Sequence, residues 1–291
     1  MGGSLRVLGG SFGSPDILVG KAVNINGRPY LFENRLGSGG FGSVYAAKTS
    51  NGMQVAVKVI MLAGTRRPEM VGRVQSFLNE VMQLNRLRQE SYHVVVIYDF
   101  GFDAQTGQAY IVMELGNENL STLIKRLRVM NQSRGVAIDS EMIKEFWRQM
   151  VSIVGSLHRH GIVHMDLKPD NLILFGVTLK IADLGISRKA DSLGQARLGT
   201  PFFSAPEVMQ DIPGIQRYYN TKADIWSLGA ILYFMVYGRP PMYQRQAHQP
   251  PRGEAIYPDH ELNDMLRRTL VLDPNYRADI VEVAFHPYTR H

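Results

Sequence analysis

The segment VHMDLKPDNLIL, residues 163–174, sets three polar side chains between apolar flanks. Asp166, Lys168 and Asn171 follow one another closely, with Pro169 among them. A carboxylate, an ammonium group and an amide in so short a stretch offer a proton acceptor, a positive charge and an oxygen ligand for a cation. The segment is therefore the candidate catalytic loop.

A glycine-rich segment, LGSGGFGSV at residues 36–44, holds Gly37, Gly39 and Gly42 in the spacing G-x-G-x-x-G. The spacing alone is weak evidence, because the chain contains 28 glycines. A dinucleotide-binding fold would continue into a helix, and a Walker-type phosphate loop would end in Gly-Lys-Ser or Gly-Lys-Thr. Here VYAAK, the pair Asn51-Gly52 and QVAVKVIM predict a strand, a tight turn and a second strand. This context favours a glycine-rich flap whose backbone N–H groups cover the phosphates of ATP.

Two further charged residues stand beside apolar segments. Lys58 lies on the second predicted strand, and a buried ammonium group needs a counter-charge. Glu80 can supply it from the segment SFLNEVMQLNRL, in which the apolar residues recur at helical spacing. Asp183 lies at the start of a predicted turn that follows an apolar segment. This position suits a Mg²⁺ ligand, because hard cations prefer oxygen donors.

The chain divides into a strand-rich part and a helical part. Residues 1–25 are rich in Gly and Ser and are predicted to form a flexible tail. Strands are predicted at 94–102 and 108–115, and a helix at 141–158 with Asp139 or Ser140 as its N-cap. We predict an α+β bilobal fold over residues 26–291. Its N-lobe (26–115) has mainly antiparallel strands and one helix, and its larger C-lobe (116–291) is helical.

From about residue 29 to 289 the order and spacing of these motifs resemble the eukaryotic protein kinase family. The resemblance implies that Asp166 orients the attacking hydroxyl or accepts its proton, and that Lys168 neutralises charge on the transferred phosphoryl group. It implies that Lys58, paired with Glu80, holds the α- and β-phosphates. The metal ligands implied for Mg²⁺ are Asn171 and Asp183, and the implied structural supports are Glu207, which pairs with Arg277, and Asp224, which braces the catalytic loop.

The same resemblance implies an apolar adenine pocket that Met113 limits at the back, with the backbone of Glu114 and Gly116 bonding the edge of the ring. The full set of implied ATP-binding residues is Leu36, Gly37, Gly39, Gly42, Val44, Ala56, Lys58, Met113, Glu114, Gly116 and Ile173.

Lys168 and the segment GTPFFSAPE are typical of the serine/threonine class. The segments VNINGRPYLFENRLGSGG, YIVMELGNENL and HGIVHMDLKPDNLIL resemble the monopolar-spindle (TTK) dual-specificity kinases. The loop LGSGGFGSVY is equally similar to the proviral-integration kinases, but those have a proline in the hinge that this chain lacks. We expect transfer of the γ-phosphoryl group of Mg-ATP to Ser or Thr hydroxyls of proteins, with Tyr and a spindle-checkpoint role as extensions of the closer resemblance. The alternative is a pseudokinase scaffold that binds nucleotide or partners without efficient transfer.

Three departures from the family pattern carry expectations. Met165 stands where arginine usually receives a loop phosphate, so it is expected to pack beneath the loop, and Leu184 is expected to fill the usual place of phenylalanine. Residues 239–260 hold five prolines and no helical period where the family has a substrate-docking helix. The candidate phosphorylation sites are Ser187, Ser192 and Thr200, and the cations that could receive a phosphate are Arg188, Lys189 and Arg197.

The composition of the chain bears on its disulfides, its membrane association and its nucleic-acid binding. The chain has no cysteine, so disulfides are excluded, and its N-terminus lacks the features of a signal peptide. The longest apolar segment, residues 225–238, is too short to span a bilayer, and no membrane association is expected. The net charge is +6, but the cations are scattered, so no direct nucleic-acid binding is expected. The expected partners are protein substrates and ATP, the expected location is the cytoplasm, the nucleus or both, and the oligomeric state is left open.

Overall fold

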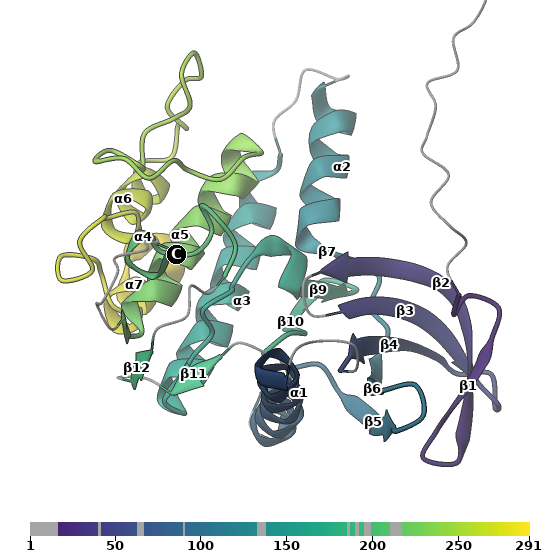
Figure 1. Ribbon diagram of the computed structural model, residues 1–291. Helices are drawn as coiled ribbons and strands as arrows, with labels where there is room; N and C mark the ends of the chain where they lie inside the picture. The colour runs from purple at the N-terminus through teal and green to yellow at the C-terminus, as the bar shows by residue number, and fades with distance from the viewer. Residues whose placement is uncertain are drawn as a thin grey trace, which may run out of the picture.

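The computed structural model describes residues 17–39, 42–62, 67–89, 91–132, 138–184, 187–189, 192–194, 199–209 and 217–291. A strand-rich part and a helical part lie side by side, as Figure 1 shows. The strand-rich part is a six-stranded antiparallel sheet in the order β1-β2-β3-β4-β6-β5. Its strands are β1 (Ala22–Ile25), β2 (Arg28–Gly39), β3 (Gly42–Thr49), β4 (Gln54–Met61), β5 (Ile97–Asp103) and β6 (Gln108–Glu114).

Two Asn-Gly pairs make tight turns in this sheet. Asn51-Gly52 joins β3 to β4 as predicted, with Gly52 at a φ of 85°. Asn26-Gly27 joins β1 to β2, with φ of 50° and 81°, values that the two-residue hairpin turn requires. The predicted flexible tail at residues 1–25 is therefore wrong for Ala22–Ile25, which form β1; residues 1–16 lie outside the described ranges.

The alternation of side chains in β4 separates two apolar clusters. Val55, Val57 and Val59 belong to a small cluster on one face of the sheet. Ala56 and Ile60 belong to the large cluster on the other face, together with residues of helix α1 (Arg67–Arg88). The predicted apolar stripe of this helix is buried: Phe77, Val81, Leu84 and Leu87. Because strand residues alternate with period two, Lys58 shares the face that meets α1.

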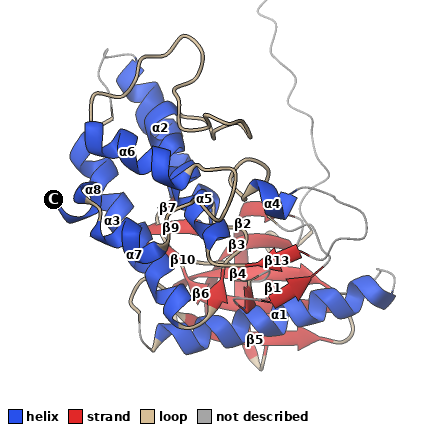
Figure 2. Ribbon diagram, turned by 90° about the vertical axis from the view of Figure 1, so that its left-hand side faces the viewer, coloured by secondary structure: helices blue, strands red, loops and turns tan. Residues whose placement is uncertain are grey.

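Seven helices follow the sheet within the described residues. They are α2 (Leu120–Gln132), α3 (Ser140–Arg159), α4 (Pro206–Met209), α5 (Lys222–Tyr237), α6 (His260–Thr269), α7 (Ile280–Phe285) and α8 (Pro287–Arg290). Figure 2 shows α1 lying along the strands, apart from these other long helices. Helix α3 begins after Asp139, one of the two predicted N-caps, whose side chain accepts from the N–H of Glu141.

Helix α5 is buried nearly all round, and Trp226 on it and Trp147 on α3 are fully buried. The large apolar cluster runs from the sheet through Met113 and Leu184 to these helices, so both parts share one core. None of the helices in the described ranges combines the length and apolar character that a membrane span requires.

Short strands hold the candidate catalytic loop. It leaves β8 (Ile162–Val163), passes through a 3₁₀ turn at Pro169–Asn171 and enters β9 (Leu172–Phe175). Strand β9 lies between β10 (Thr178–Ile181) and β7 (Glu118–Asn119), and β8 pairs with β11 (Arg188–Lys189). Strand β12 (Ser192–Gly194) pairs with β13 (Arg217–Tyr219). Between α5 and α6 the chain forms only turns and bends, in agreement with the expectation for residues 239–260.

Candidate active site

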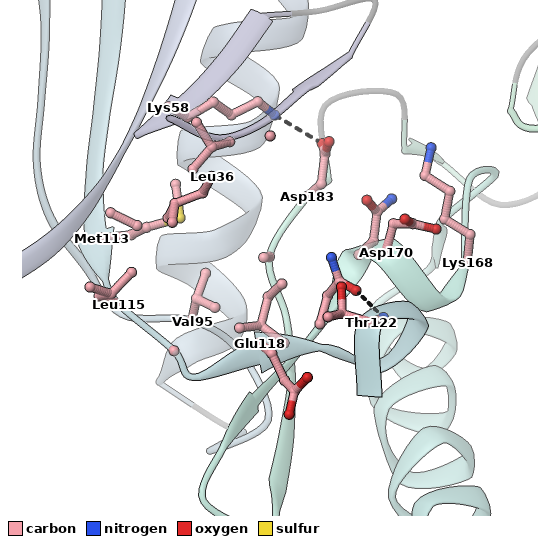
Figure 3. A pocket seen from close by; sticks show the side chains of 18 of the residues that line it. Leu36, Lys58, Val95, Met113, Leu115, Glu118, Thr122, Lys168, Asp170 and Asp183 are labelled. Carbon is pink, nitrogen blue, oxygen red and sulfur yellow. Dashed lines mark hydrogen bonds and ion pairs between the residues drawn. The ribbon is translucent and has the colours of Figure 1, made fainter. Parts of the chain in front are cut away.

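A cavity of about 870 Å³ lies where the sheet meets the helical part. Its size is within the roughly 300–1,000 Å³ of small-molecule sites. In Figure 3, Leu36, Met113 and Leu115 gather on the side of the sheet, while Lys168 and Asp170 lie opposite. The predicted site residues that line the cavity are Leu36, Gly37, Gly42, Val44, Ala56, Lys58, Met113, Glu114, Gly116, Asp166, Lys168, Asn171, Ile173, Asp183 and Thr200.

Lys58 forms the predicted buried ion pair with Glu80. Its Nζ lies 2.8 Å and 2.7 Å from the two carboxylate oxygens of Glu80. Asp183 adds a second carboxylate, with Oδ1 at 3.1 Å from the same Nζ, and Figure 3 shows the two side chains facing each other. Lys58 is 6% exposed and Glu80 is 1% exposed, so neither charge is screened well by solvent.

The contact of one ammonium group with two carboxylates changes the pKa values of Lys58 and Glu80. Burial lowers the pKa of Lys58, but the carboxylates of Glu80 and Asp183 outweigh burial and raise it above its ordinary value. Burial raises the pKa of Glu80 to about 7; Lys58 opposes this rise and Asp183 adds to it. The excess negative charge of the cluster favours a further cation beside Asp183.

The glycine-rich flap is the end of the β2–β3 hairpin. Gly37 pairs with Val44 and Gly39 pairs with Gly42, while residues 40–41 between them lie outside the described ranges. Gly42 has a φ of 147°, and a Cβ there would collide with the carbonyl oxygen of Val59 on β4. Glycine is therefore required at this position by both the backbone conformation and the close approach of β4.

The apolar end of the cavity contains the four residues predicted to surround adenine. Val44, Ala56 and Ile173 line it together with Met113, which is 4% exposed. The chain leaves β6 here, and a Cβ on Gly116 would collide with the side chain of Ile173. The backbone N–H of Glu114 donates to the carbonyl of Val96 at 3.0 Å, so the predicted contact of Glu114 with a base must come from its carbonyl oxygen.

The side chain of Glu114 is part of a support that the sequence did not indicate. Both of its carboxylate oxygens accept from Nζ of Lys180 on β10, at 2.7 Å and 2.9 Å. One of them also accepts from the backbone N–H of Val96. The ion pair thus ties the end of β6 to the strand that leads into Asp183.

The catalytic loop meets a threonine from much later in the chain. Lys168 Nζ donates to Asp166 Oδ2 at 2.8 Å and to the hydroxyl of Thr200 at 2.8 Å. The same hydroxyl donates to Asp166 Oδ1 at 2.6 Å. Three polar groups therefore form a closed triangle at one end of the cavity, and the triangle fixes the aspartate and the lysine relative to each other.

The structure bears differently on the three candidate phosphorylation sites. The hydroxyl of Thr200 is engaged in the triangle, and a phosphate on it would break both hydrogen bonds. Ser187 is 4% exposed, and its hydroxyl donates to the carbonyl of Leu184 at 2.8 Å. The side chain of Ser192 lies outside what the structure describes. Of the candidate receiving cations, Arg188 and Lys189 have a described backbone only, and Arg197 lies outside the described ranges.

Asp224 braces the catalytic loop as predicted. It is fully buried and accepts from the backbone N–H groups of His164 and Met165, at 2.9 Å and 3.1 Å, and from Nε2 of His158 at 2.9 Å. Burial raises the pKa of Asp224, but the hydrogen bonds and nearby histidines outweigh burial and lower it overall. Met165 has a φ of 71° and is 2% exposed, in the apolar core where Leu184 is also fully buried. Both side chains are therefore buried and apolar, while packing of Met165 beneath the loop and replacement of phenylalanine by Leu184 stay predictions.

The other predicted support is a buried bidentate ion pair. Arg277, 1% exposed, donates to the two carboxylate oxygens of Glu207 at 2.8 Å and 3.0 Å. It also donates to the carbonyls of Lys222, Val271 and Leu272, so all five N–H donors of its guanidinium have partners. This geometry anchors the start of α4 on the helical core.

Asn171 and Asp183 fit the predicted Mg²⁺ ligands. The amide nitrogen of Asn171 donates to the carbonyl of Asp166 at 2.9 Å, which leaves the amide oxygen as the group that can bind a cation. Asp183 supplies a carboxylate, and both residues line the cavity. Oxygen donors beside an excess of negative charge suit a hard divalent cation.

Sequence reasoning missed several residues of the cavity wall and one role. Thr200 was predicted as a phosphorylation site, although its contacts are those of a positioning residue. No local pattern indicated the wall residues after β6, because they depend on how α2 is placed against β9. The additional lining residues are Ser38, Val95, Leu115, Asn117, Glu118, Asn119, Thr122, Asp170, Ala182 and Gly199.

Comparison with known proteins gives one family. The protein kinase domain family matches residues 30–289. The chain is 31% identical to "Dual specificity protein kinase TTK" of Mus musculus over 94% of this chain and 33% of that protein. It is 28% identical to "Probable serine/threonine-protein kinase mps1" of Dictyostelium discoideum over 91% of this chain and 28% of that protein. It is also 27% identical to "Serine/threonine-protein kinase ULK3" of Homo sapiens, over 89% of this chain and 54% of that protein. The chain thus spans a third or less of the first two relatives.

Proposed function

The chain belongs to the protein kinase family, and from this premise we propose that it transfers the γ-phosphoryl group of Mg-ATP to Ser and Thr hydroxyls of proteins. The observation that carries the proposal is the triangle of Asp166, Lys168 and Thr200 in the same cavity as Lys58 and Asp183. A proton acceptor and two lysines in one cavity suit transfer of an anionic group to a hydroxyl.

In the proposed reaction, Asp166 accepts the proton of the acceptor hydroxyl or orients that hydroxyl for attack on the γ-phosphorus. Lys168 neutralises the charge that gathers on the transferred oxygens, and Thr200 keeps Lys168 in place. Lys58, held by Glu80, binds the α- and β-phosphates beneath the glycine-rich flap. Asn171 and Asp183 would hold Mg²⁺, which neutralises phosphate charge when bound.

The adenine ring is proposed to lie between Val44, Ala56 and Ile173, with Met113 behind it. The carbonyl of Glu114 would accept from the base, and the backbone of Gly116 would supply the second contact. In the described residues the backbone groups of Gly116 have no hydrogen-bond partner, which leaves them for a ligand.

The names of the relatives extend the proposal. "Dual specificity" in the name of the Mus musculus protein supports Tyr as a further acceptor, and the similarity to monopolar-spindle kinases supports a role in spindle-checkpoint signalling. We place the protein in the cytoplasm, the nucleus or both. A role in the checkpoint predicts that cells without the protein fail to delay mitosis when the spindle is disrupted.

The direct test is a radiolabelled ATP assay on a peptide library with Ser, Thr or Tyr as acceptor, beside an Asp183→Asn control. We expect label on Ser and Thr peptides that requires Mg²⁺ and disappears in the control, while the circular dichroism spectrum of the control is unchanged. Label that persists in Asp183→Asn would come from a contaminating kinase. Tight ATP binding without transfer would favour the pseudokinase alternative.

A further inference from the structure

Tyr243, in the proline-rich segment at residues 239–259, contacts the loop beside the catalytic triangle. Its hydroxyl accepts from the backbone N–H of Phe202 at 2.7 Å and donates to the backbone carbonyl of Ser204 at 2.7 Å. Its ring also packs on Phe202, with the ring centroids 5.1 Å apart. One side chain thus binds the loop through its main chain and through an aromatic contact.

Phe202 needs such support because its backbone is in an unfavourable conformation. Its φ is 69°, a left-handed value that bulky residues rarely adopt. Strained residues persist where the surroundings hold them. Tyr243 holds the N–H of Phe202, and Nε1 of Trp226 donates to its carbonyl at 3.3 Å.

The same loop is also bonded to the catalytic loop, through Ser204 and Thr200. The hydroxyl of Ser204 accepts from the N–H of Thr200 at 2.8 Å and donates to the carbonyl of Met165 at 3.4 Å. Thr200 in turn bonds Asp166 and Lys168. A continuous series of hydrogen bonds therefore leads from the catalytic aspartate through Ser204 to Tyr243.

The loop that Tyr243 contacts lies beside Asp166, where the acceptor hydroxyl of a substrate must bind. An acceptor hydroxyl must come within hydrogen-bonding distance of Asp166, about 2.6–3.2 Å. The neighbouring residues of the peptide must then lie over the adjoining surface, and Gly199 and Thr200 line the cavity directly beside it. Pro201 is exposed and Phe202 is partly exposed, so residues 199–203 are available to the peptide main chain.

We infer that Tyr243 is a positioning residue for the protein substrate: it fixes residues 199–204 so that the peptide next to the acceptor hydroxyl meets a rigid surface. The inference rests on the proposed function. It gives the segment that replaces the family's docking helix a role in holding the substrate-binding loop. Tyr243 is not expected to contribute to ATP binding, because it is not among the residues that line the cavity.

The test is Tyr243→Phe, which keeps the aromatic ring and removes both hydrogen bonds. We expect kcat/KM for a peptide to fall about tenfold or more, mainly through the KM for the peptide. The KM for ATP and the slow hydrolysis of ATP by water should stay within about twofold, because neither uses the peptide surface.

The matched control is Tyr233→Phe. Tyr233 also donates from a partly buried hydroxyl to a backbone carbonyl of the same segment, that of Gln249 at 2.9 Å. Tyr243→Phe loses two hydrogen bonds and Tyr233→Phe loses one, but only Tyr243→Phe loses hydrogen bonds to residues 199–204. Hydrogen exchange of the Phe202 amide should become faster in Tyr243→Phe and stay unchanged in the control.

Each outcome decides the question. An equal fall in peptide kcat/KM in both variants, or unchanged peptide kinetics in Tyr243→Phe, overturns the inference and leaves the proposed function standing. A wild-type protein that transfers no phosphoryl group to any peptide overturns the proposed function and this inference with it. A change in peptide KM restricted to Tyr243→Phe, with faster exchange at Phe202, supports it.

Discussion

The hydroxyl of Thr200 donates to Oδ1 of Asp166 at 2.6 Å and accepts from Lys168, although 34 residues separate it from the aspartate. The contact joins the end of the segment that follows Asp183 to the catalytic loop. The carboxylate and the ammonium group are both held by one short side chain, so their geometry depends on how this segment folds.

Thr200→Val, which keeps the shape and removes the hydroxyl, should therefore lower kcat for peptide phosphorylation by about 10²-fold. The KM for ATP should change by less than about threefold, because Thr200 lies at the other end of the cavity from Lys58. Thr200→Ser keeps the hydroxyl and is the control, with kcat expected near the wild-type value. Equal kcat in the Val and Ser variants would show that the triangle has no part in transfer.

Replacement of the buried lysine tests the phosphate-binding end. Lys58→Met should reduce phosphoryl transfer by about 10²-fold or more, because the phosphates lose the charge that positions them. Lys48→Met is the matched control, since Lys48 is exposed on the neighbouring strand β3. Steady-state kinetics with radiolabelled ATP measure both. Wild-type turnover in Lys58→Met would remove this residue from the mechanism.

The back of the adenine pocket can be tested with enlarged nucleotides. Met113 is 4% exposed and lines the cavity, so Met113→Gly should open space behind the ring and admit ATP that carries a bulky N6 substituent. Because the change also leaves a cavity in the core, a fall in stability of about 2–5 kcal/mol is expected. The measurement is the ratio of kcat/KM for the substituted and natural nucleotides. A ratio equal to that of the wild type would mean that another residue limits the pocket.

The contribution of Asp224 to the free energy of unfolding should depend on pH. Its pKa is lowered in the folded protein, so its stabilising contribution is present above the unfolded pKa of 3.8 and is lost as the pH falls through the lower folded value. Asp224→Asn should therefore cost about 1–3 kcal/mol of unfolding free energy at pH 7. The difference from the wild type should narrow at pH values below 3.8, as measured by urea unfolding. A difference that is the same at pH 7 and pH 3 would contradict a role for the ionised carboxylate.

Short sequence patterns were enough to predict the catalytic loop and the Lys58–Glu80 pair. The polar residues within 163–174 indicated the catalytic loop because they lie close together in the sequence, and strand and helix periodicity indicated the Lys58–Glu80 pair. Strand β1 was missed although Asn26-Gly27 carries the same hairpin signal as Asn51-Gly52. Its composition, rich in Gly and Ser nearby, favoured a tail.

The contacts that escaped prediction join segments far apart in the chain. Tyr243 bonds Phe202 and Ser204, and Lys180 bonds Glu114. No periodicity relates these residues, since each contact depends on how separate elements pack. The same limit explains why Thr200 was assigned to phosphorylation: its sequence neighbourhood resembles a loop site, while its hydroxyl points to Asp166.

Met165 bears on regulation. In kinases with arginine at this place, the guanidinium binds a phosphate on the loop and can order it through one to three charge-assisted hydrogen bonds. Met165 is 2% exposed and apolar, so it offers a loop phosphate no such partner. Of the candidate sites, Ser187 is buried and Thr200 is engaged with Asp166.

Removal of loop phosphate should therefore change kcat/KM by less than about tenfold, which is about 1.4 kcal/mol. Because Ser187 is buried and Thr200 is engaged with Asp166, Ser192 is the site to follow. The protein is treated with phosphatase, loss of phosphate is verified by mass spectrometry, and peptide kinetics are measured before and after. Ser192→Ala provides the control: any change in kcat/KM that comes from phosphate on Ser192 should be absent when this variant is treated with phosphatase. A hundredfold fall would mean that a cation elsewhere, among Arg188, Lys189 and Arg197, receives the phosphate, and that Met165 does not release the enzyme from this requirement.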